Sequence, residues 1–131
     1  VPKLALLVTS SAFRSYVQTC PDTISIRITH GSLDYQSLST LLNWVNQIMS
    51  LPGHKLGVNV PVDCIQIIKT RYAAQVLGME PYVRHFVENY KLGLRYRTPT
   101  PYEFQVVEEC SLVEKDDMVE AVGRRIAYLC R

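Results

Sequence analysis

Residues 71–86, RYAAQVLGMEPYVRHF, carry two apolar helical patterns separated only by Gly78-Met79-Glu80-Pro81. Gly78 stands where a helix commonly ends, because the residue after the last turn adopts a left-handed conformation that glycine tolerates best. Pro81 stands where a helix commonly begins, because its missing N–H costs nothing in the first turn. The stretch therefore predicts two helices joined by a very short connection, which makes them pack directly against each other.

The first helix of this pair is expected to begin at Asp63, with Gln66 three residues later in a capping-box arrangement. Its apolar face is formed by Ile65, Ile68, Tyr72 and Val76. The second helix is expected to end at Gly93, and its own apolar stripe contains Val83, Phe86, Val87 and Tyr90. Both helices thus have one face that must be covered by the rest of the chain.

Further helices are expected on either side of this pair. Residues 34–50 have a single apolar stripe, and residues 3–18 form two short helical turns or one helix interrupted near Ser10-Ser11. Thr100 and Glu103 predict the start of a helix that runs to about residue 110. A last helix is expected to use Asp117 and Glu120 as its capping pair. The cations in its last turns suit the negative end of the helix dipole, and they are Arg124, Arg125 and Arg131.

One segment alternates as a strand does. In Thr23–Thr29, TISIRIT, the isoleucines face one side and the polar residues face the other. Residues 55–60, KLGVNV, can form only a short extended piece at a sheet edge, because Pro61 follows. Since a lone strand is not stable, the first segment must pair with residues 55–60, with residues missing from this chain, or with another chain. The predicted fold class is therefore α+β, a helical cluster around a small sheet.

The bulk composition is that of an ordinary globular domain. The 131 residues carry a net charge of +2, well short of the strongly basic balance typical of nucleic-acid-binding domains. No apolar run approaches the roughly 20 residues of a membrane span. The four cysteines form no CxxC pair, which favours free thiols in a reducing compartment, nuclear or cytoplasmic. The chain begins without methionine, so we expect it to be a fragment of a longer protein.

No motif for catalysis is present in the sequence. It has no GxSxG nucleophile elbow, no phosphate-binding glycine loop and no HExxH metal motif. The three histidines are scattered, so no local spacing suggests a zinc site. The carboxylates near the last two helices are better explained by solvated faces and helix caps than by paired catalytic acids. We therefore expect no enzymatic activity and no cofactor.

The order of these segments resembles a BTB/POZ domain of the fungal type with a C-terminal helical extension. The residues that carry the resemblance are Val1-Pro2-Lys3, Ser10-Ser11-Ala12-Phe13, Ala73-Ala74 and Leu77-Gly78-Met79-Glu80. It implies a BTB/POZ-like core over residues 1–93, a linker over 94–101 and two extra helices over 102–131. Two features depart from the family pattern. The usual Tyr-Thr-Gly turn is replaced by Asn46-Gln47-Ile48, and the family's dimerisation helix would precede Val1.

The resemblance implies a non-enzymatic protein-interaction module, acting as a scaffold or adaptor. Its partners would be a second copy in a homodimer, another protein in a heteromer, a cullin-type ubiquitin ligase scaffold, or chromatin and transcription regulators. Contact residues are expected on the helix after Pro81, in the 51–56 loop and on the N-terminal helices. The candidates are Leu4, Tyr16, Leu51, His54, Tyr82, Arg84, His85 and Tyr90.

Two other functions remain open from the sequence. Lys91, Arg95 and Arg97 alternate with tyrosines and could track a phosphate backbone while the rings stack on bases. The same cations could equally belong to a solvated helix end and an exposed linker, since three charges are a small footprint. A third interpretation is that the chain is a purely structural domain within a large assembly.

Overall fold

The computed structural model describes residues 3–20, 33–50 and 57–131, and its regular elements in these ranges are seven α-helices and one 3-10 helix. In chain order they are α1 (Lys3–Thr9), α2 (Ser11–Thr19), α3 (Tyr35–Ser50), α4 (Cys64–Leu77), η1 (Glu80–Val83), α5 (His85–Leu94), α6 (Pro101–Glu109) and α7 (Asp117–Leu129).

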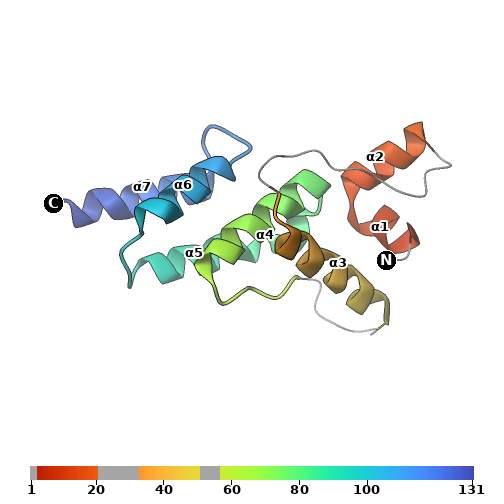
Figure 1. Ribbon diagram of the computed structural model, residues 1–131, viewed down its shortest axis with the longest axis horizontal. Helices are drawn as coiled ribbons and strands as arrows, with labels where there is room; N and C mark the ends of the chain where they lie inside the picture. Colours follow the sequence, from red (N-terminus) through yellow and green to blue (C-terminus); the bar gives the residue numbers. More distant parts are fainter. Residues whose placement is uncertain (1–2, 21–32, 51–56) are drawn as a thin grey trace.

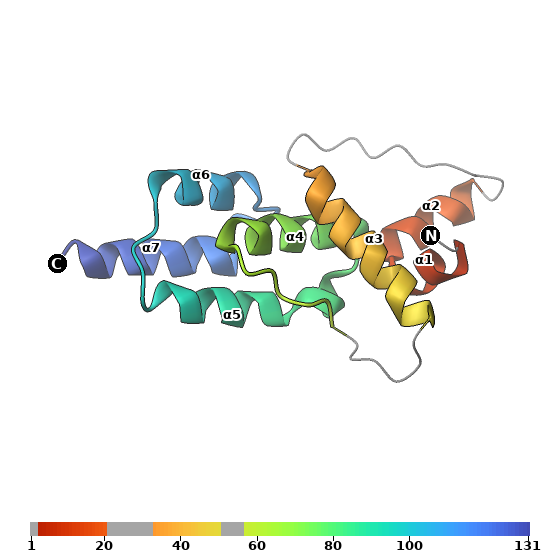
Figure 2. The same cartoon turned by 60° about the horizontal axis from the view of Figure 1, so that its bottom comes forward.

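Helix α4 is the central element (Figure 1). It contacts α2, α3, η1, α5 and α6, while α7 packs against α5 and α6. Figure 2 shows α5, α6 and α7 side by side towards the C-terminus, with α1, α2 and α3 gathered at the other end of α4. The core follows this arrangement, since fully buried side chains come from α3, α4, α5, α6 and α7; among them are Leu41, Ala73, Phe86, Val107 and Val122.

The predicted α+β class is wrong, because the ranges that the structure describes contain helices and no strand or sheet. Thr23–Thr29 lies outside the described residues. Of the second expected strand, residues 57–60 are described and are irregular. The Val58 N–H donates to the Tyr82 carbonyl at 2.9 Å, so this piece of chain is bonded to η1. A single bond to a helical turn satisfies that donor without starting a sheet.

Most expected helix ends are confirmed. Asp63 caps α4 by accepting from the Ile65 N–H at 3.1 Å, and Thr100 caps α6 by accepting from the Glu103 N–H at 3.1 Å. The break near Ser10-Ser11 is also present, between α1 and α2. The last helix differs from expectation. Its cap is Asp116, whose carboxylate accepts from the Met118 N–H at 2.9 Å, and Asp117 is the first helical residue.

The Gly78–Pro81 connection has the predicted conformation at its first residue. Gly78 is left-handed, with φ of 71°, and the Met79 N–H donates to the Ala74 carbonyl at 2.7 Å. The chain then forms the 3-10 turn η1 before α5 begins at His85. The same connection holds the corner between α1 and α2. The Ser10 hydroxyl donates to the Leu77 carbonyl, and the Ser11 N–H donates to the Gly78 carbonyl at 3.4 Å.

A buried ion pair connects α4 to the turn before α7. One guanidinium nitrogen of Arg71 lies 3.0 Å from both carboxylate oxygens of Asp116, and the two side chains are only 8% and 2% exposed. Because Asp116 also caps α7, this pair fixes where the last helix starts relative to α4. It thereby sets how α7 lies along α5.

Candidate partner-binding groove

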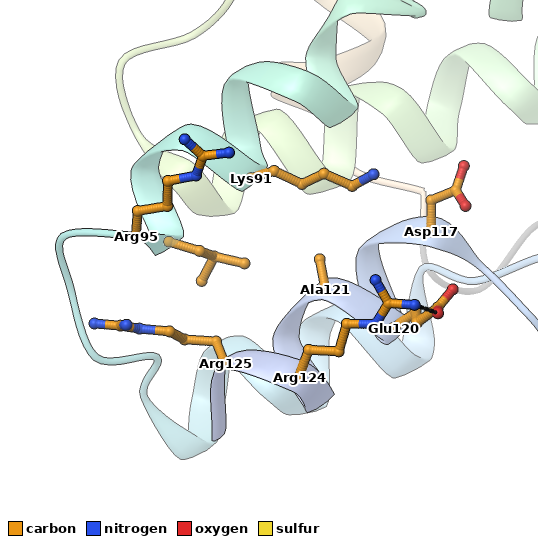
Figure 3. Close-up of a pocket in the computed structure, with 8 residues that line it drawn as sticks. Lys91, Arg95, Asp117, Glu120, Ala121, Arg124 and Arg125 are labelled. Atoms are coloured by element: carbon orange, nitrogen blue, oxygen red, sulfur yellow. Dashed lines mark hydrogen bonds and ion pairs between the residues drawn. The ribbon is translucent and has the colours of Figure 1, made fainter. Parts of the chain in front are cut away.

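A groove runs between α5 and α7 on the surface of the C-terminal half. It encloses about 250 Å³ and is open to solvent along its length. Figure 3 shows the side chains that line it, which are Lys91, Leu94, Arg95, Asp117, Glu120, Ala121, Arg124 and Arg125. Four of these eight residues are cations and two are carboxylates, so the groove is charged but not of one sign.

Helical spacing explains why these side chains meet. Lys91 and Leu94 of α5 and Arg95 just after its end are three and four residues apart and share one face. On α7, Asp117, Ala121 and Arg124 are four and three residues apart and face α5 in the same way. Leu94 is buried at the bottom, and the small Ala121 side chain opposite leaves the groove open. The groove therefore has an apolar floor between two charged walls.

One end of the groove is basic, and the other holds charges of both signs, because Lys91 and Arg124 stand beside the carboxylates there. Asp117 and Glu120 stand at the end where α7 begins, whereas Arg95 and Arg125 stand at the end where α5 finishes (Figure 3). Lys91 forms a 3.6 Å ion pair with Glu88, and Arg124 is paired with Glu120. Such exposed pairs contribute little and exchange easily for a partner's charges.

The two arginines at the basic end differ in how they are held. The Arg125 Nε donates to the Arg97 carbonyl at 3.1 Å, and its guanidinium lies 5.4 Å from the centre of the Tyr128 ring. The Arg95 side chain is exposed and forms no hydrogen bond or ion pair within the described part of the chain. One cation is thus fixed in place, and the other is available to a ligand.

A second ion pair holds the connection between α5 and α6 to α6. Arg97 and Glu103 face each other with two nitrogen–oxygen distances of 2.7 and 2.6 Å, and the Glu103 side chain is 2% exposed. This bond to Glu103 raises the pKa of Arg97, so the guanidinium stays charged at every pH the protein meets. Its guanidinium also lies 5.6 Å from the centre of the Tyr90 ring. Arg97 therefore has a structural role in holding α6 to α5.

The Tyr90 phenol is buried beside this ion pair, and its hydroxyl has no hydrogen-bond partner in the described residues. Burial first, and then the Glu103 carboxylate, raises its pKa well above the usual value. The unfolded chain ionises this phenol near pH 10, whereas the folded chain keeps it neutral. The free energy of unfolding must therefore fall as the pH rises above about 10.

Replacing Tyr90 with phenylalanine is expected to remove the decrease in the free energy of unfolding that this phenol causes at alkaline pH. Between pH 8 and 11 the free energy of unfolding should fall by about 1 kcal/mol less in Tyr90→Phe than in the parent chain. Urea titrations at several pH values measure this difference. The control is Tyr96→Phe, because Tyr96 is 86% exposed and the same hydroxyl is removed there without changing the interior. If the free energy of unfolding changed with pH in the same way in the parent chain and in Tyr90→Phe, the buried phenol would not be the cause.

The contact residues expected for a protein partner do not form one cluster. Tyr82 is half-buried against Trp44, with ring centres 4.8 Å apart, and His85 Nε2 lies 2.7 Å from the Val58 carbonyl. Arg84 and Tyr16 are exposed. Tyr90 is only 1% exposed, so, unlike the prediction, it is unavailable for direct contact with a partner. Leu4 belongs to α1 but its side chain is not described, and Leu51 and His54 lie outside the described residues.

Tyr82 lines a second hollow, of about 470 Å³, at the other end of α4. This hollow lies where the α1–α2 corner meets the Gly78–Pro81 connection and the turn before α7. Its exposed apolar side chains include Val8, Leu112 and Val113.

The three cations considered for nucleic acid have different surroundings. Lys91 and Arg95 line the groove, while Arg97 is held by Glu103. Sequence reasoning missed Arg124 and Arg125 as groove residues, because their position at a helix end already explained them. The available signal was the spacing of Asp117, Ala121 and Arg124, which places them on one side of α7.

Within residues 3–20, 33–50 and 57–131 no group of three or more histidine, cysteine or acidic side chains could hold a metal ion. No helix in the described part of the chain is long and apolar enough to cross a membrane. No protein-family model, curated protein or solved structure matches the chain.

Proposed function

We propose that this chain is a non-enzymatic protein-interaction module that binds a segment of a partner protein in the groove between α5 and α7. The observation that carries the proposal is a groove with Leu94 and Ala121 in its lining, a basic end and an end of mixed charge. Arg95 and Arg125 stand at the basic end, and Asp117 and Glu120 stand beside Lys91 and Arg124 at the other. A polypeptide can place carboxylates at the basic end, charges of both signs at the other end and apolar side chains between them, and this complementarity gives specificity.

The surface around the basic end of the groove has the composition of a protein interface. Tyrosine and arginine are the residues most often found at interface hot spots. Tyr96 is 86% exposed, Tyr102 57% and Tyr128 61%, and all three lie close in sequence to the arginines of this end. The hydrogen bond from Arg125 to the Arg97 carbonyl brings the α5–α6 connection against α7, so these tyrosines belong to one end of the molecule.

Nucleic acid is the second candidate ligand, because four cations line one groove. The two carboxylates in the same groove would repel a phosphate backbone, and Arg97 is already paired with Glu103. A net charge of +2 adds little non-specific attraction for nucleic acid. Retention on heparin that weakens steeply with salt would support nucleic acid. Passage through the column without retention would support the protein partner.

The partner classes implied by the BTB/POZ resemblance stay part of this proposal. They are self-association, a cullin-type scaffold and chromatin or transcription regulators. A purely structural place in a larger assembly is a separate alternative. Cys64, Cys110 and Cys130 are free within the described residues, which supports a reducing nuclear or cytoplasmic compartment.

Selection from a library of random 16-residue displayed peptides tests the proposed function. Peptides selected by the chain should be enriched in glutamate, aspartate and large apolar residues. Binding should fall at least tenfold in the variant Arg95→Glu/Arg125→Glu, because both cations at the basic end then repel the same carboxylates. Fluorescence anisotropy of a labelled selected peptide measures the change in affinity.

The matched control is Arg14→Glu/Arg84→Glu, which changes the net charge by the same amount with two exposed arginines outside the groove. This control should bind the selected peptides as the parent chain does. Circular dichroism melts of both variants show whether the fold is kept, which matters because Arg125 donates to the Arg97 carbonyl. Equal losses in the two variants, or selected peptides without acidic residues, would contradict the proposal.

A further inference from the structure

The connection between α5 and α6 contains a threonine whose side chain has no structural role in the described part of the chain. The sequence of residues 95–100 is RYRTPT, and Pro101 follows, so both threonines precede a proline. Thr98 is exposed, and its hydroxyl forms no hydrogen bond within the residues that the structure describes. Thr100 is also exposed, but its hydroxyl caps α6 by accepting from the Glu103 N–H at 3.1 Å. Of the two hydroxyls, that of Thr98 is therefore the one available for modification.

The backbone around Thr98 has the conformation that a protein kinase binds. Kinases bind the residues on both sides of the acceptor hydroxyl in an extended form, and proline-directed kinases select proline as the next residue. Because a residue before proline is biased away from the helical region, Pro99 favours an extended Thr98. Residues 98–100 are irregular in the structure, and Thr100 is extended, with φ of −83° and ψ of 158°. The residues after Thr100 belong to α6, so a kinase acting on Thr100 would have to unwind that helix.

Two arginines are placed to bind a phosphate on Thr98. The Arg125 Nε donates to the Arg97 carbonyl at 3.1 Å, so this guanidinium lies one peptide unit from Thr98. Figure 3 shows it pointing towards the α5–α6 connection, with Arg95 where that connection begins. The Arg95 side chain has no bonded partner in the described ranges, whereas Arg97 is paired with Glu103. A phosphate carries about −1.5 to −2 charges and three acceptor oxygens, and it forms strong hydrogen bonds with arginine.

We infer that Thr98 is the phosphorylation site of a proline-directed protein kinase and that Arg95 and Arg125 bind its phosphate. In the transfer, the Thr98 oxygen forms a bond to the γ-phosphorus of ATP, and the bond from that phosphorus to the β-phosphate oxygen breaks. ADP leaves, and the hydroxyl proton passes to the catalytic base of the kinase. The phosphate then neutralises the basic end of the groove from within the chain. It lowers the affinity of the groove for acidic segments, and this last consequence rests on the proposed function.

Phosphorylation of the folded chain tests the site. The full chain is incubated with Mg²⁺, ATP and a purified mitogen-activated or cyclin-dependent protein kinase, and mass spectrometry maps the modified residue. Thr98 should be modified roughly tenfold faster than Thr100, because modification of Thr100 requires loss of the α6 cap. Thr98→Val should remove the main product. A synthetic peptide of residues 92–104 is the unfolded control. Modification of the peptide but not of the chain, modification mainly at Thr100, or no modification of either would overturn the inference.

The ionisation of the phosphate tests its binding by the two arginines. The second pKa of an exposed phosphothreonine is about 6, and two nearby guanidinium groups should lower it to about 5.5 or below. Phosphorus NMR at several pH values measures this pKa. In Arg95→Gln/Arg125→Gln the pKa should return to about 6. Arg95→Gln alone keeps the bond from Arg125 to the connection and should raise the pKa part of the way.

The matched control for the phosphate pKa is Arg14→Gln/Arg84→Gln, which removes two exposed arginines outside the groove. Its phosphate should keep the lowered pKa of the parent chain. Circular dichroism shows whether each variant keeps the fold. The same pKa in the parent chain, the control and the groove variants would show that the arginines do not bind the phosphate, and it would overturn the inference.

Peptide binding separates this inference from the proposed function. Acidic peptides selected on the unmodified chain should bind the Thr98-phosphorylated chain about tenfold more weakly, because the phosphate repels their carboxylates and occupies the arginines. Unchanged affinity would overturn the effect of the phosphate on the groove. If no peptide binds the unmodified chain, the proposed function fails, and the mapped residue and the phosphate pKa decide on the Thr98 site without it.

Discussion

Replacing Arg71 with methionine is expected to lower the free energy of unfolding by about 3–5 kcal/mol. The substitution leaves the Asp116 carboxylate 2% exposed and without the guanidinium that lies 3.0 Å from both of its oxygens. An unpaired buried charge is far more costly than the pair is stabilising, because its desolvation is no longer compensated. Since the carboxylate also caps α7, the start of that helix should loosen with it. Urea unfolding followed by circular dichroism measures the loss.

The double variant Arg71→Met/Asp116→Asn should recover much of that loss. Asparagine is as good a helix cap as aspartate and carries no charge, so the cap on α7 is kept while the buried charge is removed. Arg84→Met is the control, because Arg84 is exposed and a surface substitution should change the free energy of unfolding by less than about 0.5 kcal/mol. If Arg71→Met behaves like Arg84→Met, the pair does not hold α7 in place.

The helices could be predicted from the sequence because their ends are encoded locally. Asp63, Gly78 and Thr100 each act within a few residues of the backbone groups that they satisfy, and each forms the expected cap. Acidic residues 116 and 117 both suit a helix start, and the sequence pattern alone does not show which of them caps the last helix. The choice of Asp116 depends on Arg71, which is 45 residues away and recognisable only in the fold.

The prediction of a sheet failed because strand pairing depends on contacts between distant segments, which local sequence patterns do not determine. Residues 55–60 have β-forming valines and a following proline, which fits an edge strand as well as an irregular connection. In the structure, the donor of Val58 is satisfied by Tyr82 in η1, and His85 contacts the Val58 carbonyl. The η1 turn and the His85 side chain thus satisfy the backbone groups of Val58 that a neighbouring strand would have used.

Only some of the residues that line the groove could be predicted from the sequence. Lys91 and Arg95 were singled out as cations, but the pairing of α5 with α7 is a tertiary contact that no spacing within either helix reveals. Arg124 and Arg125 had a sufficient local explanation in the helix dipole. Tyr90, by contrast, was expected on a contact surface and is buried. It shares the apolar stripe of Phe86 and Val87, and that stripe decides its burial despite the polar hydroxyl.

Replacing Gly78 with alanine is expected to lower the free energy of unfolding by about 2–4 kcal/mol, for two independent reasons. An alanine at φ of 71° costs roughly 1–2 kcal/mol because its side chain crowds the backbone. The added carbon would also clash with the Ser11 hydroxyl and lie 2.9 Å from the backbone nitrogen of Ala12, and such overpacking costs about 1–3 kcal/mol. The corner between α1 and α2 should separate from α4, and amide hydrogen exchange in α2 measures that separation.

Gly123→Ala is the matched control, because a methyl group there meets no atom within 4 Å and Gly123 lies inside α7. Alanine is favoured over glycine in a helix, so this variant should raise the free energy of unfolding by about 0.5–1 kcal/mol. The same chemical change should therefore act in opposite directions at the two positions. Shifts of the same sign and size would mean that the Gly78–Pro81 connection does not hold the α1–α2 corner. The opposite signs would show that this short connection fixes both the α4–α5 pair and the N-terminal helices on α4.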